Sequence, residues 1–85
     1  YGVLTHMVAR LVGAEPYELG VYIANAHIYN NHIDAVNEQL SRNYRHRFPK
    51  LTISGSQKSI DDFRMDNFDI HGYHPLPRIK APVAV

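Results

Sequence analysis

Cysteine is missing from the 85 residues of this chain. A disulfide framework, a thiol nucleophile and a thiolate metal site are therefore excluded within it. The chain also lacks an excess of charge of either sign, because nine Lys and Arg residues face eight Asp and Glu residues, for a net charge of +1. So balanced a composition does not predict nucleic-acid binding over the whole surface, and any anion binding must be local.

Long hydrophobic runs are missing as well. No apolar stretch approaches the roughly 18 residues that a membrane-spanning helix needs, and no basic segment followed by an apolar one opens the chain. We therefore expect neither a membrane span nor a signal peptide. The chain begins at Tyr1 rather than at a methionine and runs directly into a helical pattern, so we expect it to be a piece of a longer protein.

The composition is typical of a packed domain, since 45% of the residues are hydrophobic and 11% are aromatic. A chain of this length buries only about 60–65% of the surface that it exposes when unfolded, so a core built from it alone is marginal. We expect one domain at most, which folds but does not stand independently.

Apolar periodicity predicts a chain of mixed helix and strand. The first helical stripe ends at Gly13, which can adopt the left-handed conformation of a helix C-terminus. Ser59 followed by Asp62 is the signature of a helix start, and Asn31 is placed to cap the second helix. Prolines exclude regular structure near the end of the chain. The expected elements are helices at Tyr1–Val12, His32–Leu40 and Ser59–Met65, strands at Leu19–Ala26, Leu51–Ser54 and Asn67–His71, and an extended tail at Pro75–Val85.

Polar side chains are concentrated at Asn25–His32, between the first expected strand and the second expected helix. That strand is apolar on both alternations, which predicts burial on both faces. In an extended segment His27 and Tyr29 point to the same side, and together they offer a ring nitrogen and a phenol to a hydroxyl-bearing ligand. The same spacing fits a buried, hydrogen-bonded pair with a structural role, and spacing alone favours that second interpretation.

Two other groups of residues invite a functional interpretation. Four histidines suggest a metal site, but the first two are five residues apart, whereas ligands on a helix need three or four and ligands on a strand need two. We therefore expect no metal at His27, His32, His71 and His74. The segment Arg42–Lys50 carries four cations with aromatic residues between them, which fits RNA binding but also an ordinary solvated loop, and we favour the loop.

A series of short motifs runs through essentially the whole chain. They are Leu4-Thr5-His6-Met7, His27-Ile28-Tyr29 with Asn31-His32, Gln39-Leu40-Ser41-Arg42, Ser59-Ile60 with Asp62-Phe63, Gly72-Tyr73 with Pro75 and Pro77, and Ile79-Lys80-Ala81-Pro82-Val83-Ala84-Val85. In this order the motifs resemble the C-terminal part of the thymidylate synthase family.

The resemblance implies an α/β (α+β) thymidylate-synthase-like fold, of which residues 1–85 form the C-terminal portion, in a cytoplasmic homodimer. The implied reaction is the reductive methylation of dUMP to dTMP, with 5,10-methylenetetrahydrofolate giving both the carbon and the hydride. By position, His27 and Tyr29 match the pair that hydrogen-bonds the 3′-hydroxyl group of the deoxyribose. The mobile tail Pro75–Val85 matches the segment that closes over the folate, with Ala84 near the pterin and the Val85 carboxylate anchoring the closed form.

The resemblance also implies what this chain lacks. The nucleophilic cysteine of the family, its phosphate-binding arginines and its pyrimidine-reading asparagine lie upstream of Tyr1, so we expect no catalytic residue here and no activity from the 85 residues alone. Ala24-Asn25 stands where the family usually has Gly-Asp. Because dUMP and dCMP hydroxymethylases share this architecture, a hydroxymethylase is the alternative to the synthase.

Overall fold

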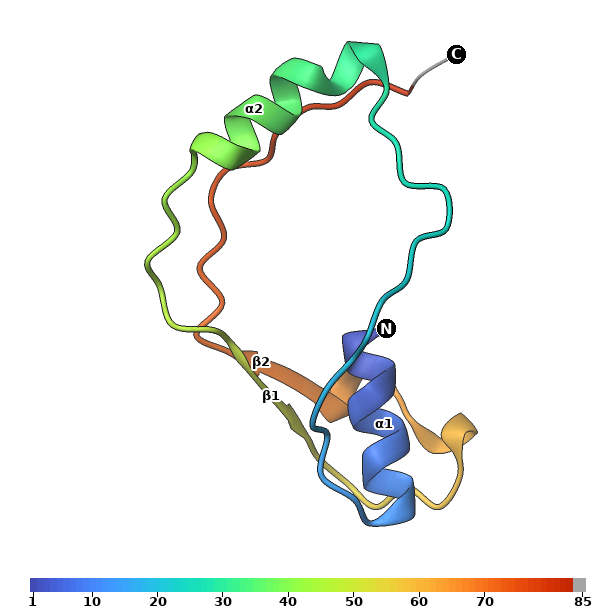
Figure 1. The fold of residues 1–85 in the computed structure, drawn as a ribbon. Coiled ribbons are helices and arrows are strands. Elements are labelled where there is room, and N and C mark those ends of the chain that lie inside the picture. Colours follow the sequence, from blue (N-terminus) through green and yellow to red (C-terminus); the bar gives the residue numbers. More distant parts are fainter. Residues whose placement is uncertain (84–85) are drawn as a thin grey trace. The chain divides into compact units, whose positions relative to one another are not determined.

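The computed structural model describes residues 1–83 and divides the chain into two compact units. The first unit consists of Tyr1–Tyr22 and Phe48–Tyr73, and the second consists of Ile23–Arg47 and the residues from His74 onward. Figure 1 labels the helices and strands of both. Each unit therefore joins two segments that are distant in the sequence.

Helix α1, Gly2–Val12, opens the first unit and confirms the predicted first helix. Gly13 ends it in the left-handed conformation, with φ at 69°. The backbone N–H of Ala14 donates to the carbonyl of Ala9 at 2.9 Å, and that of Gly13 donates to the carbonyl of Arg10 at 3.4 Å. This pairing is a Schellman cap, and it satisfies carbonyl groups that the end of a helix otherwise leaves without partners.

Strands β1, Lys50–Ile53, and β2, Phe68–His71, form a two-stranded antiparallel sheet in the first unit. Lys50 pairs with His71 and Ile53 with Phe68. Both predicted strands are confirmed to within one residue at each end. The guanidinium group of Arg10 ties α1 to the connection between the strands, because it donates to the Gln57 Oε1 atom at 2.9 Å and to the carbonyl of Gly55.

The connection between β1 and β2 contains two 3₁₀ turns, η2 at Ile60–Asp62 and η3 at Met65–Asn67. The prediction of one helix at Ser59–Met65 was therefore wrong. Phe63 takes an extended conformation, with φ at −71° and ψ at 136°, and ends η2. This residue is only 9% exposed and stacks on Phe68 at 5.8 Å between ring centroids. The ring of Phe63 is therefore buried at the point where the helical conformation is interrupted.

The predicted helix-start signature at Ser59 nevertheless forms. The Oγ atom of Ser59 accepts a hydrogen bond from the backbone N–H of Asp61 at 3.1 Å. The Asp62 carboxylate accepts from the backbone N–H groups of Lys58 and Ser59, each at 2.9 Å. These two backbone donors, Lys58 first, lower the pKa of Asp62, so the ionised carboxylate stabilises this turn.

Helix α2, Ile33–Ser41, belongs to the second unit and confirms the predicted second helix. A 3₁₀ turn, η1 at Asn30–His32, leads into it. The prediction that Asn31 caps this helix was wrong, because Asn31 lies inside η1 and His32 occupies the N-cap position without a side-chain cap hydrogen bond. The carboxylate of Glu38 and the guanidinium group of Arg42 form an ion pair at 2.7 Å across one helical turn.

The segment predicted as a strand at Leu19–Ala26 is irregular, and no strand among residues 1–83 pairs with it. Val21 is 72% exposed and Tyr22 is 92% exposed, so the expected burial on both faces was wrong for this chain. A strand needs a hydrogen-bonded neighbour to satisfy its backbone N–H and C=O groups. An apolar pattern indicates that a segment suits a buried position in a sheet, but it does not identify the neighbouring strand.

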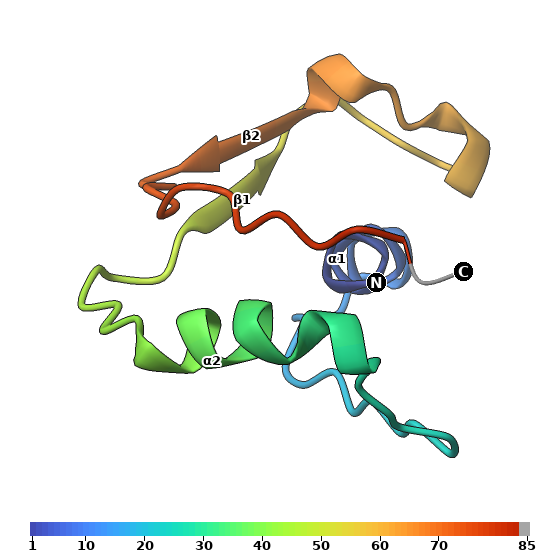
Figure 2. The same ribbon diagram turned by 90° about the horizontal axis from the view of Figure 1, so that it is seen from above.

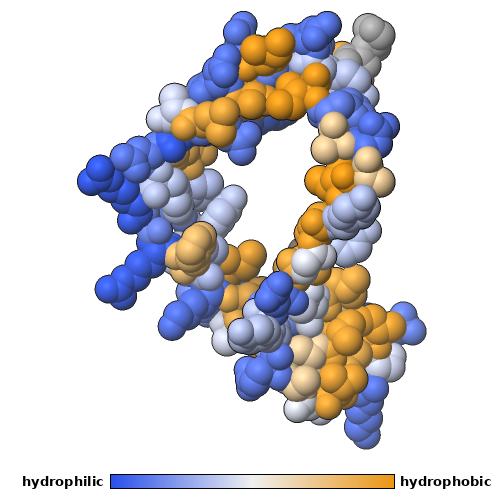
Figure 3. Space-filling view, in the orientation of Figure 1, coloured by the Kyte–Doolittle hydropathy of each residue, from blue (hydrophilic) through white to orange (hydrophobic). Residues whose placement is uncertain are grey.

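The buried core among residues 1–83 is small, with Ala9 and Phe63 as its buried hydrophobic residues. Figure 3 shows hydrophobic side chains gathered on the surface over α1. Val3, Leu4 and Val8, which belong to the apolar stripe of that helix, are all exposed. No helix among residues 1–83 is long and apolar enough to cross a membrane.

Candidate functional site

The segment that leads into α2 carries the predicted pair His27 and Tyr29. Both residues are exposed, Tyr29 at 51%, so the structure does not bury them as a structural pair. The Nδ1 atom of His27 lies 3.0 Å from the backbone carbonyl oxygen of Asn25. Because a carbonyl only accepts, the proton belongs on Nδ1, which leaves Nε2 of the neutral ring as an acceptor.

The rings of His27 and Tyr29 are in contact, with centroids 5.0 Å apart and planes at 76°. The ring of His32 also contacts Tyr29, with centroids 5.6 Å apart and planes at 81°. Edge-to-face packing of this kind is a favoured arrangement of aromatic rings and restricts their rotation. The structure therefore brings His27 and Tyr29 together and adds His32 as a neighbour that spacing did not predict.

The chemistry of this pair suits a single hydroxyl group. A hydroxyl group donates one hydrogen bond and accepts others, whereas Nε2 of His27 accepts and the phenol of Tyr29 can donate. One ligand hydroxyl can thus satisfy both side chains at once. The contact of His27 to Asn25 uses the backbone carbonyl of that residue.

The described part of the C-terminal tail, residues 75–83, contacts side chains at the two ends of α2. The guanidinium group of Arg42 donates to the carbonyl of Pro77 at 2.6 Å, and Nε2 of His32 lies within hydrogen-bonding distance of the carbonyl of Pro82. The predicted folate contacts of the tail, Ala84 and Val85, lie outside the described residues.

The histidines of the metal hypothesis are divided between the two units. His71 belongs to the first unit, where its ring contacts Thr52 and Asp69, whereas the other three histidines of the metal hypothesis belong to the second. Within residues 1–83 no three His, Cys, Asp or Glu side chains lie close enough to hold a metal ion. Of the four cations in Arg42–Lys50, Arg42 is engaged inside the chain by Glu38 and Pro77.

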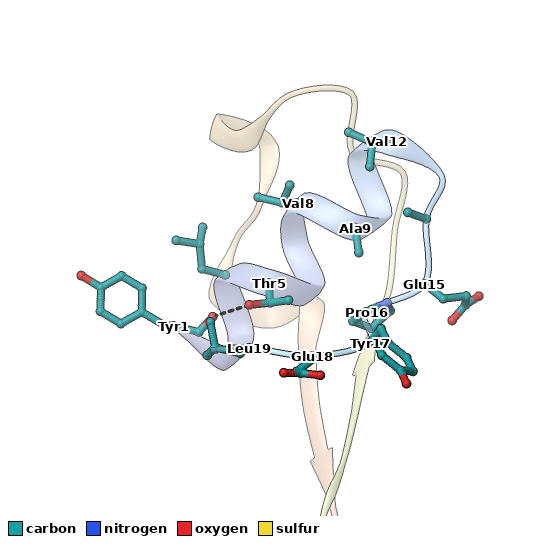
Figure 4. Close-up of a pocket in the computed structure, with 12 residues that line it drawn as sticks. Tyr1, Thr5, Val8, Ala9, Val12, Glu15, Pro16, Tyr17, Glu18 and Leu19 are labelled. Carbon is teal, nitrogen blue, oxygen red and sulfur yellow. Dashed lines mark hydrogen bonds between the residues drawn. The ribbon is translucent and has the colours of Figure 1, made fainter. Parts of the chain in front are cut away.

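An apolar groove lies in the first unit, between α1 and the segment that follows it (Figure 4). Its volume is about 580 Å³, and Leu4, Val8 and Tyr17 are among its lining residues. The Oγ1 atom of Thr5 donates to the carbonyl of Tyr1 at 3.1 Å, so this hydroxyl group is already bonded. The groove contains none of the predicted site residues, and its lining is largely apolar.

A contacting histidine and tyrosine therefore precede a helix whose two ends contact an extended tail. Comparison with known proteins gives the family. A family model described as thymidylate synthase matches residues 1–85. The chain therefore belongs to the thymidylate synthase family, which confirms the resemblance carried by its motifs.

Individual relatives agree with that assignment. Over all 85 residues the chain is 46% identical to a thymidylate synthase of Saccharomyces cerevisiae and 47% identical to one of Listeria monocytogenes. A thymidylate synthase of Listeria innocua is 46% identical over the same length. The chain spans 28% of the length of the first of these proteins and 27% of the length of the other two.

Proposed function

We propose that this chain is the C-terminal part of a thymidylate synthase that converts dUMP to dTMP with 5,10-methylenetetrahydrofolate. The observation that carries the proposal is the match of the family model to the whole chain, together with relatives named thymidylate synthase at 46–47% identity. The complete enzyme works as a cytoplasmic homodimer, and residues 1–85 belong to its single thymidylate-synthase-like α/β domain.

Within that enzyme, His27 and Tyr29 bind the 3′-hydroxyl group of the deoxyribose. The arrangement of the two side chains supports this role: the hydroxyl group donates to Nε2 of His27, whose Nδ1 proton is held by the Asn25 carbonyl at 3.0 Å, and accepts from the phenol of Tyr29. Edge-to-face contact between the rings fixes the two groups relative to each other before the nucleotide arrives.

The tail closes over the folate, with Ala84 near the pterin and the carboxylate of Val85 anchoring the closed form. Closure excludes water and holds the nucleotide and the folate together during transfer of the carbon and the hydride. The exposed apolar surface of α1 is covered by the remainder of the enzyme, which is consistent with the chain spanning 27–28% of its relatives. The nucleophile comes from that remainder.

The test is the identity of the products formed by the complete enzyme. With dUMP and 5,10-methylenetetrahydrofolate we expect dTMP and dihydrofolate in equal amounts, because the folate gives up a hydride as well as a carbon. A dUMP or dCMP hydroxymethylase would instead form a hydroxymethylated pyrimidine nucleotide and tetrahydrofolate. Mass spectrometry of both products separates the two activities, and formation of tetrahydrofolate without dTMP would overturn the proposal.

A further inference from the structure

Three backbone carbonyls of residues 74–83 accept hydrogen bonds from side chains near α2. Arg42 donates to the Pro77 carbonyl at 2.6 Å, His32 contacts the Pro82 carbonyl, and the hydroxyl group of Tyr44 donates to the carbonyl of His74 at 3.2 Å. Figure 1 and Figure 2 show the described residues of the tail running along α2. These contacts are at His74, immediately before the tail, and at Pro77 and Pro82 within it.

The spacing of the two principal contacts suits a straight tail. His32 and Arg42 flank α2 and are ten residues apart, which corresponds to about 15 Å at the rise of an α-helix. Pro77 and Pro82 are five residues apart, which corresponds to about 16 Å in a nearly extended chain. The two lengths agree, so both ends of the 77–82 segment can be held on the helix without a bend in the tail.

The sequence of the tail leaves these carbonyls available. A proline has no backbone N–H, and residues 74–83 contain no strand, so no backbone ladder takes up their carbonyls. Ile79, between the two held prolines, is half-buried, and so are Ala35 and Val36 of α2. These apolar side chains are thus partly sheltered from solvent.

Arg42 is itself held in place. Its guanidinium group donates to the Glu38 carboxylate at 2.7 Å while another nitrogen of the same group donates to the Pro77 carbonyl, and the side chain is 23% exposed. A planar guanidinium group can serve two acceptors in fixed directions, which an ammonium group cannot do equally well. The ion pair therefore directs Arg42 at the tail.

We propose that His32 and Arg42 are positioning residues that hold residues 77–82 of the tail on α2 and so determine where the residues after Pro82 can reach. This inference rests on the proposed function, in which those residues close over the folate. Neither side chain has to touch the reacting atoms. Loss of either contact releases the tail from the helix and lowers the fraction of the enzyme in which the tail is placed for closure.

The test uses His32→Ala and Arg42→Ala in the complete enzyme, with Arg42→Lys as the conservative variant and Arg45→Ala as a matched control from the same basic segment. We expect kcat/KM for the folate to fall about 2- to 13-fold in His32→Ala, which loses one neutral hydrogen bond, and about 13- to 150-fold in Arg42→Ala, which loses a charged donor. Arg42→Lys should recover part of that loss. The Kd of dUMP for Arg42→Ala, and both constants for Arg45→Ala, should stay within about twofold of the parent.

Trypsin provides a readout that is independent of activity, because Arg78 and Lys80 lie in the held part of the tail. We expect the fragments that begin at Ile79 and Ala81 to be released faster from His32→Ala and Arg42→Ala than from the parent or Arg45→Ala, as followed by mass spectrometry. Equal release rates would overturn the inference. Faster release with unchanged folate kinetics would overturn the role of these contacts in positioning the tail. A parent enzyme that forms no dTMP would overturn the proposed function, and the release rates would then still test whether His32 and Arg42 hold the tail on α2.

Discussion

Replacing Tyr29 by phenylalanine isolates the contribution of one hydroxyl group to nucleotide binding. The ring keeps its edge-to-face contacts with His27 at 5.0 Å and with His32 at 5.6 Å, because phenylalanine has the same ring. The side chain is 51% exposed, so removing its hydroxyl group leaves no buried polar atom without a partner. We therefore expect Tyr29→Phe to change the free energy of unfolding of the complete enzyme by less than about 0.5 kcal/mol.

Binding of dUMP should respond differently. One neutral hydrogen bond contributes about 0.5–1.5 kcal/mol, so the Kd of dUMP should rise about 2- to 13-fold in Tyr29→Phe. His27→Ala should raise it at least as much, because that change removes an acceptor and a ring contact. Titration calorimetry gives the Kd and urea denaturation gives the stability. An unchanged Kd in both variants, or a loss of affinity that tracks a loss of stability, would refute the reasoning.

Two further predictions concern the turns that support the fold, and both use urea denaturation of the complete enzyme. Gly13→Ala should destabilise it by roughly 1 kcal/mol, because alanine is strained at a φ of 69° although nothing lies within 4 Å of its Cβ position. Gly20 also has nothing within 4 Å of its Cβ position but has no positive φ, so Gly20→Ala should be neutral or slightly stabilising. Equal effects of the two changes would contradict the role of Gly13 as the left-handed cap of α1. Asp62→Asn should destabilise the enzyme at neutral pH. Because the folded pKa of Asp62 is lowered, the contribution of its carboxylate is present above the unfolded pKa and disappears as the pH falls through the folded one, so parent and variant should converge in acid.

Local patterns predicted the elements whose stability is local. The stripe of α1 and the glycine after it predicted that helix together with its end, and alternation predicted β1 and β2 to within a residue. The Ser59 signature predicted a cap but not the length of the helical turn after it, because that length depends on where the ring of Phe63 is buried. That choice is made by packing, which the signature does not contain.

The irregular segment 19–26 illustrates a different limit. Its apolar residues predicted a buried strand. A strand forms only beside another strand, however, and the sequence of one segment alone does not determine which distant segment it pairs with. The exposed Val21 and Tyr22 retain the composition of a buried strand without its neighbour. The apolar pattern of a segment therefore indicates that the segment is suited to burial in a sheet. It does not indicate whether the 85 residues of this chain supply the neighbouring strand.

The candidate site was predictable in part. Spacing placed His27 and Tyr29 on one side, and the structure brings their rings into contact, but spacing alone favoured a buried structural pair and only the family resemblance pointed to a ligand. The contacts of His32 and Arg42 with the tail were not predicted, because they join residues 50 and 35 positions apart along the chain and use backbone carbonyls, which carry no sequence signal.

The most direct test of the central claim pairs a change in the protein with a change in the nucleotide. The Kd of dUMP and of its 3′-deoxy analogue is measured for the complete enzyme and for Tyr29→Phe and His27→Ala. If these side chains bind the 3′-hydroxyl group, each substitution should weaken binding of dUMP and have little effect on the analogue, so that the two changes are not additive. Equal losses of affinity for both nucleotides would contradict the account.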